Sequence, residues 1–244
     1  MLYIIGTGIY DERDLSIKAL DALKKCVKIY AEFYTSPIKV NLPALEKMAK
    51  KKITVLDRSE VEEQDIIISS AKKCDTAFLV GGDALSATTH IGFALECRKQ
   101  GIPIKIIHSS SIFTAVAESG LQLYKFGRTV SLPYKKDNYF PESPYDNIRK
   151  NLKDSLHTLL LLDIGMTANE AIGLLMELEE KLKKKLFSSN TKIVCLAHLG
   201  SDQGSTIRYG SMKDLKKQDF GALPHTIIIP GTLHFTEEEY LESL

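Results

Sequence analysis

Short apolar runs alternate with amphipathic stretches from the first residues of this chain, and this alternation constrains the fold more than any other sequence feature. The runs lie at residues 2–5, 27–34, 53–56, 76–80 and 104–107. Helical patterns separate them, at residues 14–25, 43–52, 59–73 and 87–100. Runs of β-forming residues that alternate with helices predict βαβ units around a parallel sheet. Ser59 and Glu62 have the spacing of a capping box at one helix start.

The second half of the chain has a different order of elements. Strands are predicted at residues 129–134, 157–164, 192–199, 206–212 and 225–231. The predicted helices cover residues 143–155, 167–185, 214–218 and 236–244. Ser143 is the expected N-cap before Pro144, and Thr167 forms a capping box with Glu170. Five strands in each half predict an α/β fold of two domains: residues 1–110 around a parallel sheet, and residues 111–244 around a mixed sheet.

Composition excludes several classes of protein. The 244 residues carry 32 Lys and Arg against 31 Asp and Glu, so no global field favours nucleic acid or an anionic membrane. No apolar run approaches the ~18 residues of a membrane span. The opening segment MLYIIGTG lacks the pattern of a signal peptide and reads as a first strand. Cys26, Cys74, Cys97 and Cys195 lie in apolar segments without C-x-x-C spacing, which predicts free thiols in a reducing compartment.

Polar and small residues follow the predicted strands, where open parallel sheets bind ligands. Gly6-Thr7-Gly8 begins like a dinucleotide-binding loop, but Asp11 stands where the third glycine would be and its carboxylate would face a pyrophosphate. This segment is therefore a tight turn or the place where another ligand approaches the backbone. After the fourth strand, Asp83 follows Gly81-Gly82. It either caps the next helix or presents a carboxylate to a ligand.

The remaining strand ends offer no familiar catalytic pattern. The fifth strand ends in His108-Ser109-Ser110-Ser111-Ile112, and later strands end near Leu162, near Leu199 and before His225. No G-x-S-x-G motif and no paired carboxylates of a glycosidase occur at these ends. The six histidines have no metal-ligand spacing, so no metal site is expected.

Eight segments, taken in order, resemble the diphthine synthase family, part of the tetrapyrrole-methylase-like group of S-adenosylmethionine (SAM) methyltransferases. They lie at residues 3–20, 31–36, 77–90, 120–127, 157–164, 166–171, 206–215 and 224–234. The letters ATTH (87–90) and LYKFG (123–127) separate this family from relatives that act on porphyrin precursors. One departure is Ala84, where the family usually has proline.

This resemblance implies a cytoplasmic homodimer with SAM folded into a cleft between the two domains. It implies that S-adenosylhomocysteine is the co-product and that no metal takes part. The protein substrate would be translation elongation factor 2, whose modified histidine is methylated repeatedly on its amino group to give diphthine. No nucleic acid or membrane partner is implied, and no catalytic residue is identified. The SAM-binding positions carried over from the family are Ile9, Asp83, Ser86, Ser111, Ile112, Leu162, Leu199 and His225.

Two other functions remain compatible with the sequence. A methyltransferase of the same fold that acts on a small tetrapyrrole or corrinoid would bind porphyrinogens or show visible absorbance. A non-catalytic binding module that has kept the fold would fail to bind SAM.

Overall fold

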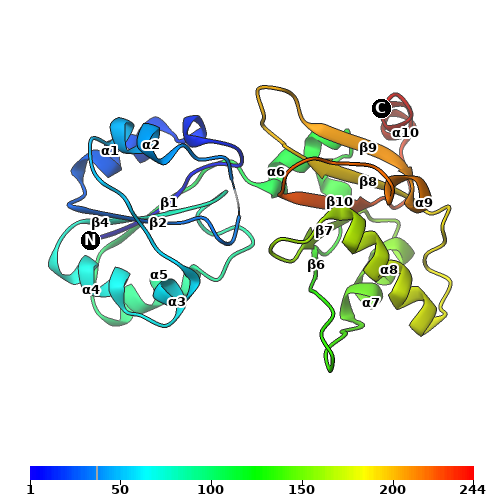
Figure 1. The fold of residues 1–244 in the computed structure, drawn as a ribbon, viewed down its shortest axis with the longest axis horizontal. Coiled ribbons are helices and arrows are strands. Elements are labelled where there is room, and N and C mark those ends of the chain that lie inside the picture. Colours follow the sequence, from blue (N-terminus) through cyan, green and yellow to red (C-terminus); the bar gives the residue numbers. More distant parts are fainter. Residues whose placement is uncertain (37) are drawn as a thin grey trace. The chain divides into compact units, whose positions relative to one another are not determined.

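The computed structural model describes residues 1–36 and 38–244, and these residues form two compact units, Met1–Ala115 and Val116–Leu244. Each unit is built on one five-stranded sheet, and Figure 1 shows the two sheets with their helices. This arrangement confirms the predicted α/β fold class. The sequence placed the change of domain after residue 110, and the compact units meet after Ala115.

The sheet of the first unit is parallel throughout, with the strand order β3-β2-β4-β1-β5. Its central strands β1 and β4 are almost entirely buried. Such strands read as continuous apolar runs because helices cover both faces of a parallel sheet. The strands are β1 (Leu2–Gly6), β2 (Lys28–Glu32), β3 (Thr54–Val55), β4 (Thr76–Val80) and β5 (Ile104–Ile107).

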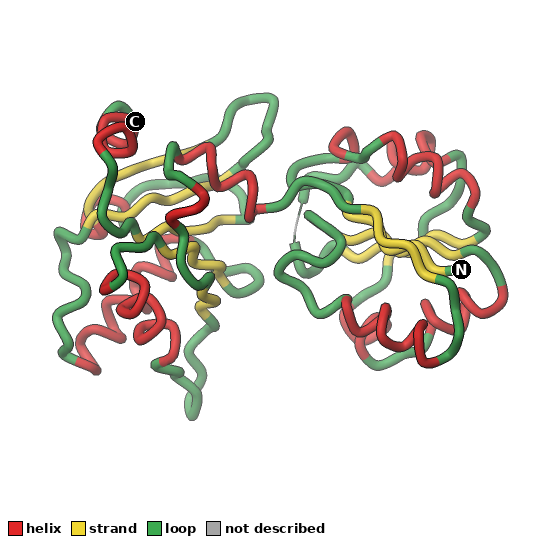
Figure 2. Tube along the Cα trace, turned by 180° about the vertical axis from the view of Figure 1, so that it is seen from behind, coloured by secondary structure: helices red, strands yellow, loops and turns green. Residues whose placement is uncertain are grey.

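Helices cover both faces of this sheet, as Figures 1 and 2 show. The helices α1 and α2 pack on one face through Leu23 and Leu45. The helices α3, α4 and α5 lie on the other face, where Ile67 and Cys97 join the core around Phe78. The helical elements are η1 (Glu12–Asp14), α1 (Ile17–Lys25), α2 (Leu42–Ala49), α3 (Arg58–Glu62), α4 (Ile66–Lys73), α5 (Ile91–Lys99) and α6 (Ile112–Ala115).

The chain segments that follow the neighbouring strands β1 and β4 lead to helices on opposite faces of the sheet. The helix after β1 is α1, and the helix after β4 is α5, which lies on the other face. In open parallel sheets, ligands commonly bind at the carboxyl ends of two adjacent strands whose connections diverge in this way. Gly6 ends β1 and Gly8 follows it, and Gly81 and Gly82 follow β4, so both glycine-containing segments lie at these carboxyl ends.

The helix predicted over residues 59–73 is wrong as a single element. The structure has two helices there, α3 and α4, separated by residues 63–65. The predicted capping box of Ser59 and Glu62 is also wrong. Asp57 is the N-cap of α3 and forms the reciprocal pair with Glu60, at the same spacing two residues earlier. A carboxylate is as good an N-cap as serine, so spacing alone did not choose between the two pairs.

The sheet of the second unit is mixed, with the strand order β6-β7-β10-β8-β9. Only β6 and β7 are parallel, and the other neighbours are antiparallel. The central strand β10 is buried along its length. The strands are β6 (Val130–Leu132), β7 (Thr158–Leu162), β8 (Lys192–Ala197), β9 (Thr206–Ser211) and β10 (His225–Ile229).

The helices of the second unit follow the predicted positions with shifted ends. Ser143 is not the N-cap of α7, because that place is taken by Glu142 without a side-chain cap. The capping box of Thr167 and Glu170 is confirmed, but α8 ends at Leu182 because Lys183 adopts a left-handed conformation. The helical elements are η2 (Val116–Ser119), η3 (Leu123–Lys125), α7 (Ser143–Lys153), α8 (Ala168–Leu182), α9 (Met212–Leu215) and α10 (Phe235–Glu242).

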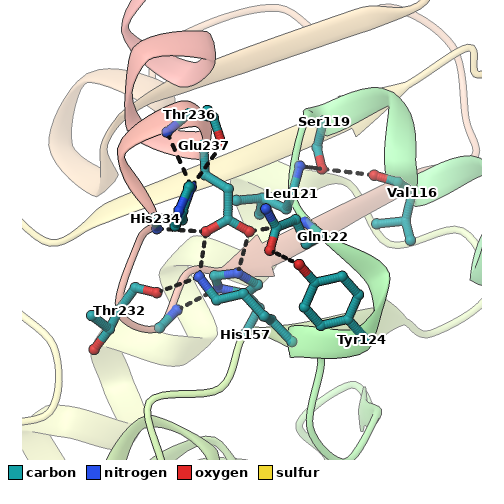
Figure 3. Close-up of polar contacts among 12 residues, drawn as sticks. Val116, Ser119, Leu121, Gln122, Tyr124, His157, Thr232, His234, Thr236 and Glu237 are labelled. Atoms are coloured by element: carbon teal, nitrogen blue, oxygen red, sulfur yellow. Dashed lines mark hydrogen bonds and ion pairs between the residues drawn. The ribbon is translucent and has the colours of Figure 1, made fainter.

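A buried carboxylate fixes the C-terminal helix to the rest of the second unit, as Figure 3 shows. Glu237 of α10 is fully buried and forms an ion pair with Lys125 of η3. It accepts hydrogen bonds from the backbone N–H of Gln122 (2.9 Å) and of His234 (2.8 Å). The Nε2 of His157 lies 3.2 Å away and donates to it, since Nδ1 of that ring accepts from the Gly231 N–H.

These donors keep Glu237 ionised in the folded protein. Burial alone would raise its pKa, but the hydrogen bonds from His234, Lys125, Gln122 and His157 outweigh that effect and lower the pKa to about 2. An unfolded glutamate has a pKa of about 4.3. Glu237 therefore stabilises the fold at pH values above the unfolded pKa, and this contribution is lost as the pH falls toward the folded value.

We expect Glu237→Gln to cost about 3 kcal/mol of unfolding free energy at pH 7, since the variant keeps the shape but loses the charge. Urea denaturation between pH 7 and pH 3 measures this. The wild type should lose stability relative to the variant as the pH falls below about 4.3. The exposed Glu239→Gln on the same helix is the control. Equal denaturation midpoints for the two variants at pH 7 would contradict the role given to Glu237.

Candidate functional site

The loops after β1 and β4 bind each other through their glycines. The Gly8 N–H donates to the Gly82 carbonyl (3.1 Å), and the Gly82 N–H donates back to the Gly8 carbonyl (2.8 Å). A Cβ on Gly6 would lie 2.5 Å from the Gly82 carbonyl oxygen. Glycine is therefore required at position 6 by the loop that crosses it. The resemblance of this segment to a dinucleotide loop has a packing explanation.

Asp14 holds the first loop in place. Its Oδ2 accepts hydrogen bonds from the backbone N–H groups of Ile9 (3.0 Å) and Tyr10 (2.8 Å). Gly8 has a φ of +91°, and a Cβ there would lie 2.0 Å from the Cβ of Asp14. The predicted site residue Ile9 thus lies at the carboxyl end of β1 with its N–H already bonded.

Asp83 connects the loops after β4 and β5. Its Oδ1 accepts from the Leu85 N–H (3.0 Å) and from the Ser86 hydroxyl (3.1 Å). Its Oδ2 accepts from the Ser109 N–H (3.0 Å) and lies 2.9 Å from Nδ1 of His108. Because β1 lies between β4 and β5 in the sheet, the carboxylate spans the end of β1. Asp83 does not cap the next helix, which begins only at Ile91.

The Asp83 carboxylate is charged at neutral pH. Burial raises its pKa, but the hydrogen bonds from Leu85, Ser109, His108 and Ser86 outweigh burial and lower the pKa below its ordinary value. Both oxygens are occupied by donors of this chain. Asp83 therefore holds the loops after β4 and β5 together.

The two other predicted residues of the first unit follow β5. Ser111 is buried, and its hydroxyl accepts from the Phe113 N–H (3.3 Å) at the start of α6. Ile112 is the first residue of that helix. Together with Ile9, Asp83 and Ser86, they come from the loops after three adjacent strands, β4, β1 and β5.

The three predicted residues of the second unit also gather at one sheet end. His225 pairs with Ala197 of β8, and Thr226 pairs with Leu161 of β7. Leu162 therefore ends β7 beside the start of β10, and Leu199 follows the end of β8. The antiparallel direction of β10 is the reason that its first residue meets the ends of its neighbours.

The ring of His225 is occupied by the protein itself. Its Nδ1 accepts from the Ala168 N–H (3.2 Å), which leaves Nε2 to donate to the Gly221 carbonyl (3.2 Å). Burial lowers the pKa of this histidine and keeps it neutral. Because both ring nitrogens are occupied, a ligand beside His225 would have only the backbone of this residue available for hydrogen bonds.

Sequence reasoning missed two residues of the first unit. Asp14 lies within the segment predicted as a helix, and its role depends on the fold of the loop before it. His108 was noted as part of a strand end but was not selected, although its ring lies against Asp83. A histidine that follows a strand end next to small hydroxyl residues was the signal available.

Other chemistry has little support in the described part of the chain. Burial raises the pKa of Cys26 to about 11 and of Cys195 to about 12, so these thiols are not nucleophiles at neutral pH. Among residues 1–36 and 38–244, no group of three or more His, Cys, Asp or Glu side chains could hold a metal ion. In the same ranges, every helix is too short or too polar to cross a membrane.

Comparison with known proteins gives a consistent result. Residues 1–216 match the model of the tetrapyrrole (corrin/porphyrin) methylases. The diphthine synthase of Methanococcus maripaludis strain C5 is 48% identical over 252 residues, covering 100% of this chain and 98% of that protein. The diphthine synthase of Methanocaldococcus jannaschii is 46% identical over 254 residues, with the same coverage.

Solved structures agree with the sequence relatives. A crystal structure of a candidate diphthine synthase from Entamoeba histolytica has a TM-score of 0.92 and 37% identity, covering 100% of this chain and 97% of that one. A second crystal structure of a diphthine synthase has a TM-score of 0.87 and 30% identity, with 100% and 95% covered.

The chain belongs to the tetrapyrrole methylase family and, within it, to the diphthine synthases. It is accordingly a SAM-dependent methyltransferase of diphthamide biosynthesis.

We expect Asp83→Asn to destabilise the first unit by about 1.5–3 kcal/mol, the range for hydrogen bonds to a charged group. The new amide would place N–H groups against the donors that now point at the carboxylate. Urea denaturation measures the loss. Asp21→Asn, an exposed change on α1, is the matched control and should stay within about 0.5 kcal/mol of the wild type. A loss no larger than that of the control would show that the four donors do not depend on the charge.

Proposed function

We propose that this chain uses SAM to methylate the amino group of the modified histidine of translation elongation factor 2, repeatedly, giving diphthine and S-adenosylhomocysteine. The observation that carries the proposal is the full-length match to proteins named diphthine synthase, at 48% identity for the Methanococcus maripaludis relative. A family model alone would leave the substrate open, because that family is named for tetrapyrroles.

We propose that SAM is bound by the eight residues carried over from the family. Five follow β1, β4 and β5 at the diverging connections of a parallel sheet, where such folds bind ligands. Gly82 has a φ of +73°, and a Cβ there would meet no atom within 4 Å, so the backbone is open to a ligand on that side. The residues are Ile9, Asp83, Ser86, Ser111, Ile112, Leu162, Leu199 and His225.

The residues present fit a ligand that is held mainly by backbone groups and shape. The side chains of Asp83 and His225 are engaged within the protein, and the others are small or apolar. SAM would supply an electrophilic methyl group, to which the amine nitrogen bonds as the carbon–sulfur bond breaks toward sulfur. The chain would contribute alignment and exclusion of water, worth up to ~7–11 kcal/mol in favourable cases.

We further propose that the enzyme works as a homodimer in the cytoplasm, with elongation factor 2 as its protein partner. Both the dimer and the location rest on the family resemblance. The near-equal numbers of acidic and basic residues favour docking by local shape and contacts more than by a global field.

We expect the protein to bind SAM and S-adenosylhomocysteine in the presence of a metal chelator. The reason is that no group of three or more His, Cys, Asp or Glu side chains among the described residues could hold a metal ion. Isothermal calorimetry measures the binding. Heat of binding that appears only after a divalent metal is added would contradict this expectation.

Labelled methyl groups should pass from SAM to elongation factor 2 that carries the aminocarboxypropyl group, and not to factor that lacks it. The unmodified histidine has no such amine to attack the methyl donor. Intact-mass analysis should show successive additions of one methyl group. Methyl incorporation into the factor lacking the precursor would refute the proposed nucleophile, and transfer to a porphyrinogen instead would favour the tetrapyrrole alternative.

A further inference from the structure

His108 follows β5 and shows two different environments on its two ring nitrogens. Its Nδ1 lies 2.9 Å from Oδ2 of Asp83, which is buried. The His108 side chain is nevertheless 68% exposed, in contrast to 8% for the Asp83 side chain. In the described part of the chain, no side chain or backbone group is bonded to Nε2 of His108.

The charge on Asp83 decides which nitrogen of His108 carries the proton. The hydrogen bonds to Asp83 lower its pKa despite burial, so its carboxylate is ionised and can only accept. The Nδ1 of His108 must therefore be the N–H donor. In the neutral ring, Nε2 then carries a lone pair that faces solvent. A buried carboxylate that orients a histidine in this way is the arrangement of a general base.

The three buried histidines His90, His157 and His225 do not have this arrangement. His90, in the loop after β4, is buried, and burial lowers its pKa to about 4. His157 and His225 are buried with both nitrogens bonded to protein groups. The carboxylates of Asp83 and Asp14 near His108 are held by donors of this chain. The neighbouring elements also carry Lys105 on β5 and Glu12 and Arg13 on η1.

We propose that His108 is the catalytic base that takes a proton from the substrate amine through Nε2, and that Asp83 positions His108. This inference rests on the proposed function. The residue lies at the carboxyl end of β5, next to the end of β1 where we place SAM. None of the eight family positions includes it.

In each round of methylation, the substrate nitrogen must lose a proton, and a base such as His108 can accept it. An alkyl ammonium has no lone pair, so it must first lose one proton, which passes to Nε2 of His108. The free amine then forms its nitrogen–carbon bond as the carbon–sulfur bond breaks, with both electrons going to sulfur. The nitrogen is left positively charged. While it still carries hydrogen, it must lose another proton before the next round. The proton on Nε2 of His108 then passes to water.

The substitution His108→Asn distinguishes the roles of the two ring nitrogens. The asparagine amide can still donate to Asp83 from near the position of Nδ1, but it has no base at the position of Nε2. With precursor-bearing elongation factor 2, we expect the rate of the variant at pH 7 to fall about 100-fold, the lower end of the range for general base catalysis. The variant should gain about tenfold per pH unit as free amine accumulates, whereas the wild-type rate should level off.

Three further measurements distinguish a base from a structural residue. Long-range nitrogen–hydrogen NMR of the wild type should show the Nδ1–H tautomer of His108. Calorimetry with S-adenosylhomocysteine should give affinities within about twofold for wild type and His108→Asn. Added imidazole should restore activity to His108→Ala, since it supplies the missing base.

The outcomes separate this inference from the function on which it rests. If the wild type binds S-adenosylhomocysteine but transfers no methyl to the precursor-bearing factor, the proposed function fails. If the wild type is active and the ratio of wild-type to His108→Asn rates stays constant across pH, His108 is not the base. An affinity loss in His108→Asn equal to its rate loss would make it a binding residue, and an Nε2–H tautomer would also overturn the inference.

Discussion

The carboxylate of Asp83 forms the interaction on which the carboxyl end of the first sheet depends. It lies at the carboxyl edge of a parallel sheet and spans the end of β1 between the loops that follow β4 and β5. Four donors converge on it, and their sum exceeds the cost of burying the charge. An apolar side chain at this place would leave the partly buried N–H groups of Leu85 and Ser109 without their acceptor, which costs free energy. The charge also fixes the tautomer of His108. The Asp83 carboxylate therefore holds the loops together and also determines which nitrogen of His108 carries the proton.

The glycines around this carboxylate show how a motif can be misread when its partner is unseen. Gly6 and Gly8 have the spacing of a dinucleotide loop, but their missing side chains make room for Gly82 and Asp14. The absence of side chains lets the loops after β1 and β4 form a backbone bridge between Gly8 and Gly82. In the second unit, a buried charge again connects chain segments that are distant in sequence, since Glu237 of α10 contacts Lys125 of η3 and His157, the residue before β7.

Glu237 also gives a physical reason for three of the segments that resemble the family. The segment at residues 120–127 supplies Gln122 and Lys125 to this carboxylate, and the segment at residues 224–234 supplies His234. His157, which begins a third such segment, completes the set of donors. These residues hold the C-terminal helix in place, so their pattern reflects the stability of the second unit. Similarity in a segment therefore does not by itself indicate contact with a substrate.

Much of this fold could be predicted from the sequence, because apolar runs at strand spacing and helix signals between them are local features. The ten strands, the parallel first sheet and the capping box at Thr167 follow from such patterns, and so does the gathering of Ile9, Asp83 and Ser111 near strand ends. Tertiary structure alone decided which strands became neighbours. That choice set Asp83 against His108, 25 residues away in the chain, and placed Gly82 over Gly6. The sequence also did not determine whether Ser59 or Asp57 caps the helix, because both residues satisfy the same local rule. Local patterns report burial and backbone preference, whereas the proton on a ring nitrogen depends on a partner that only the folded chain brings within reach.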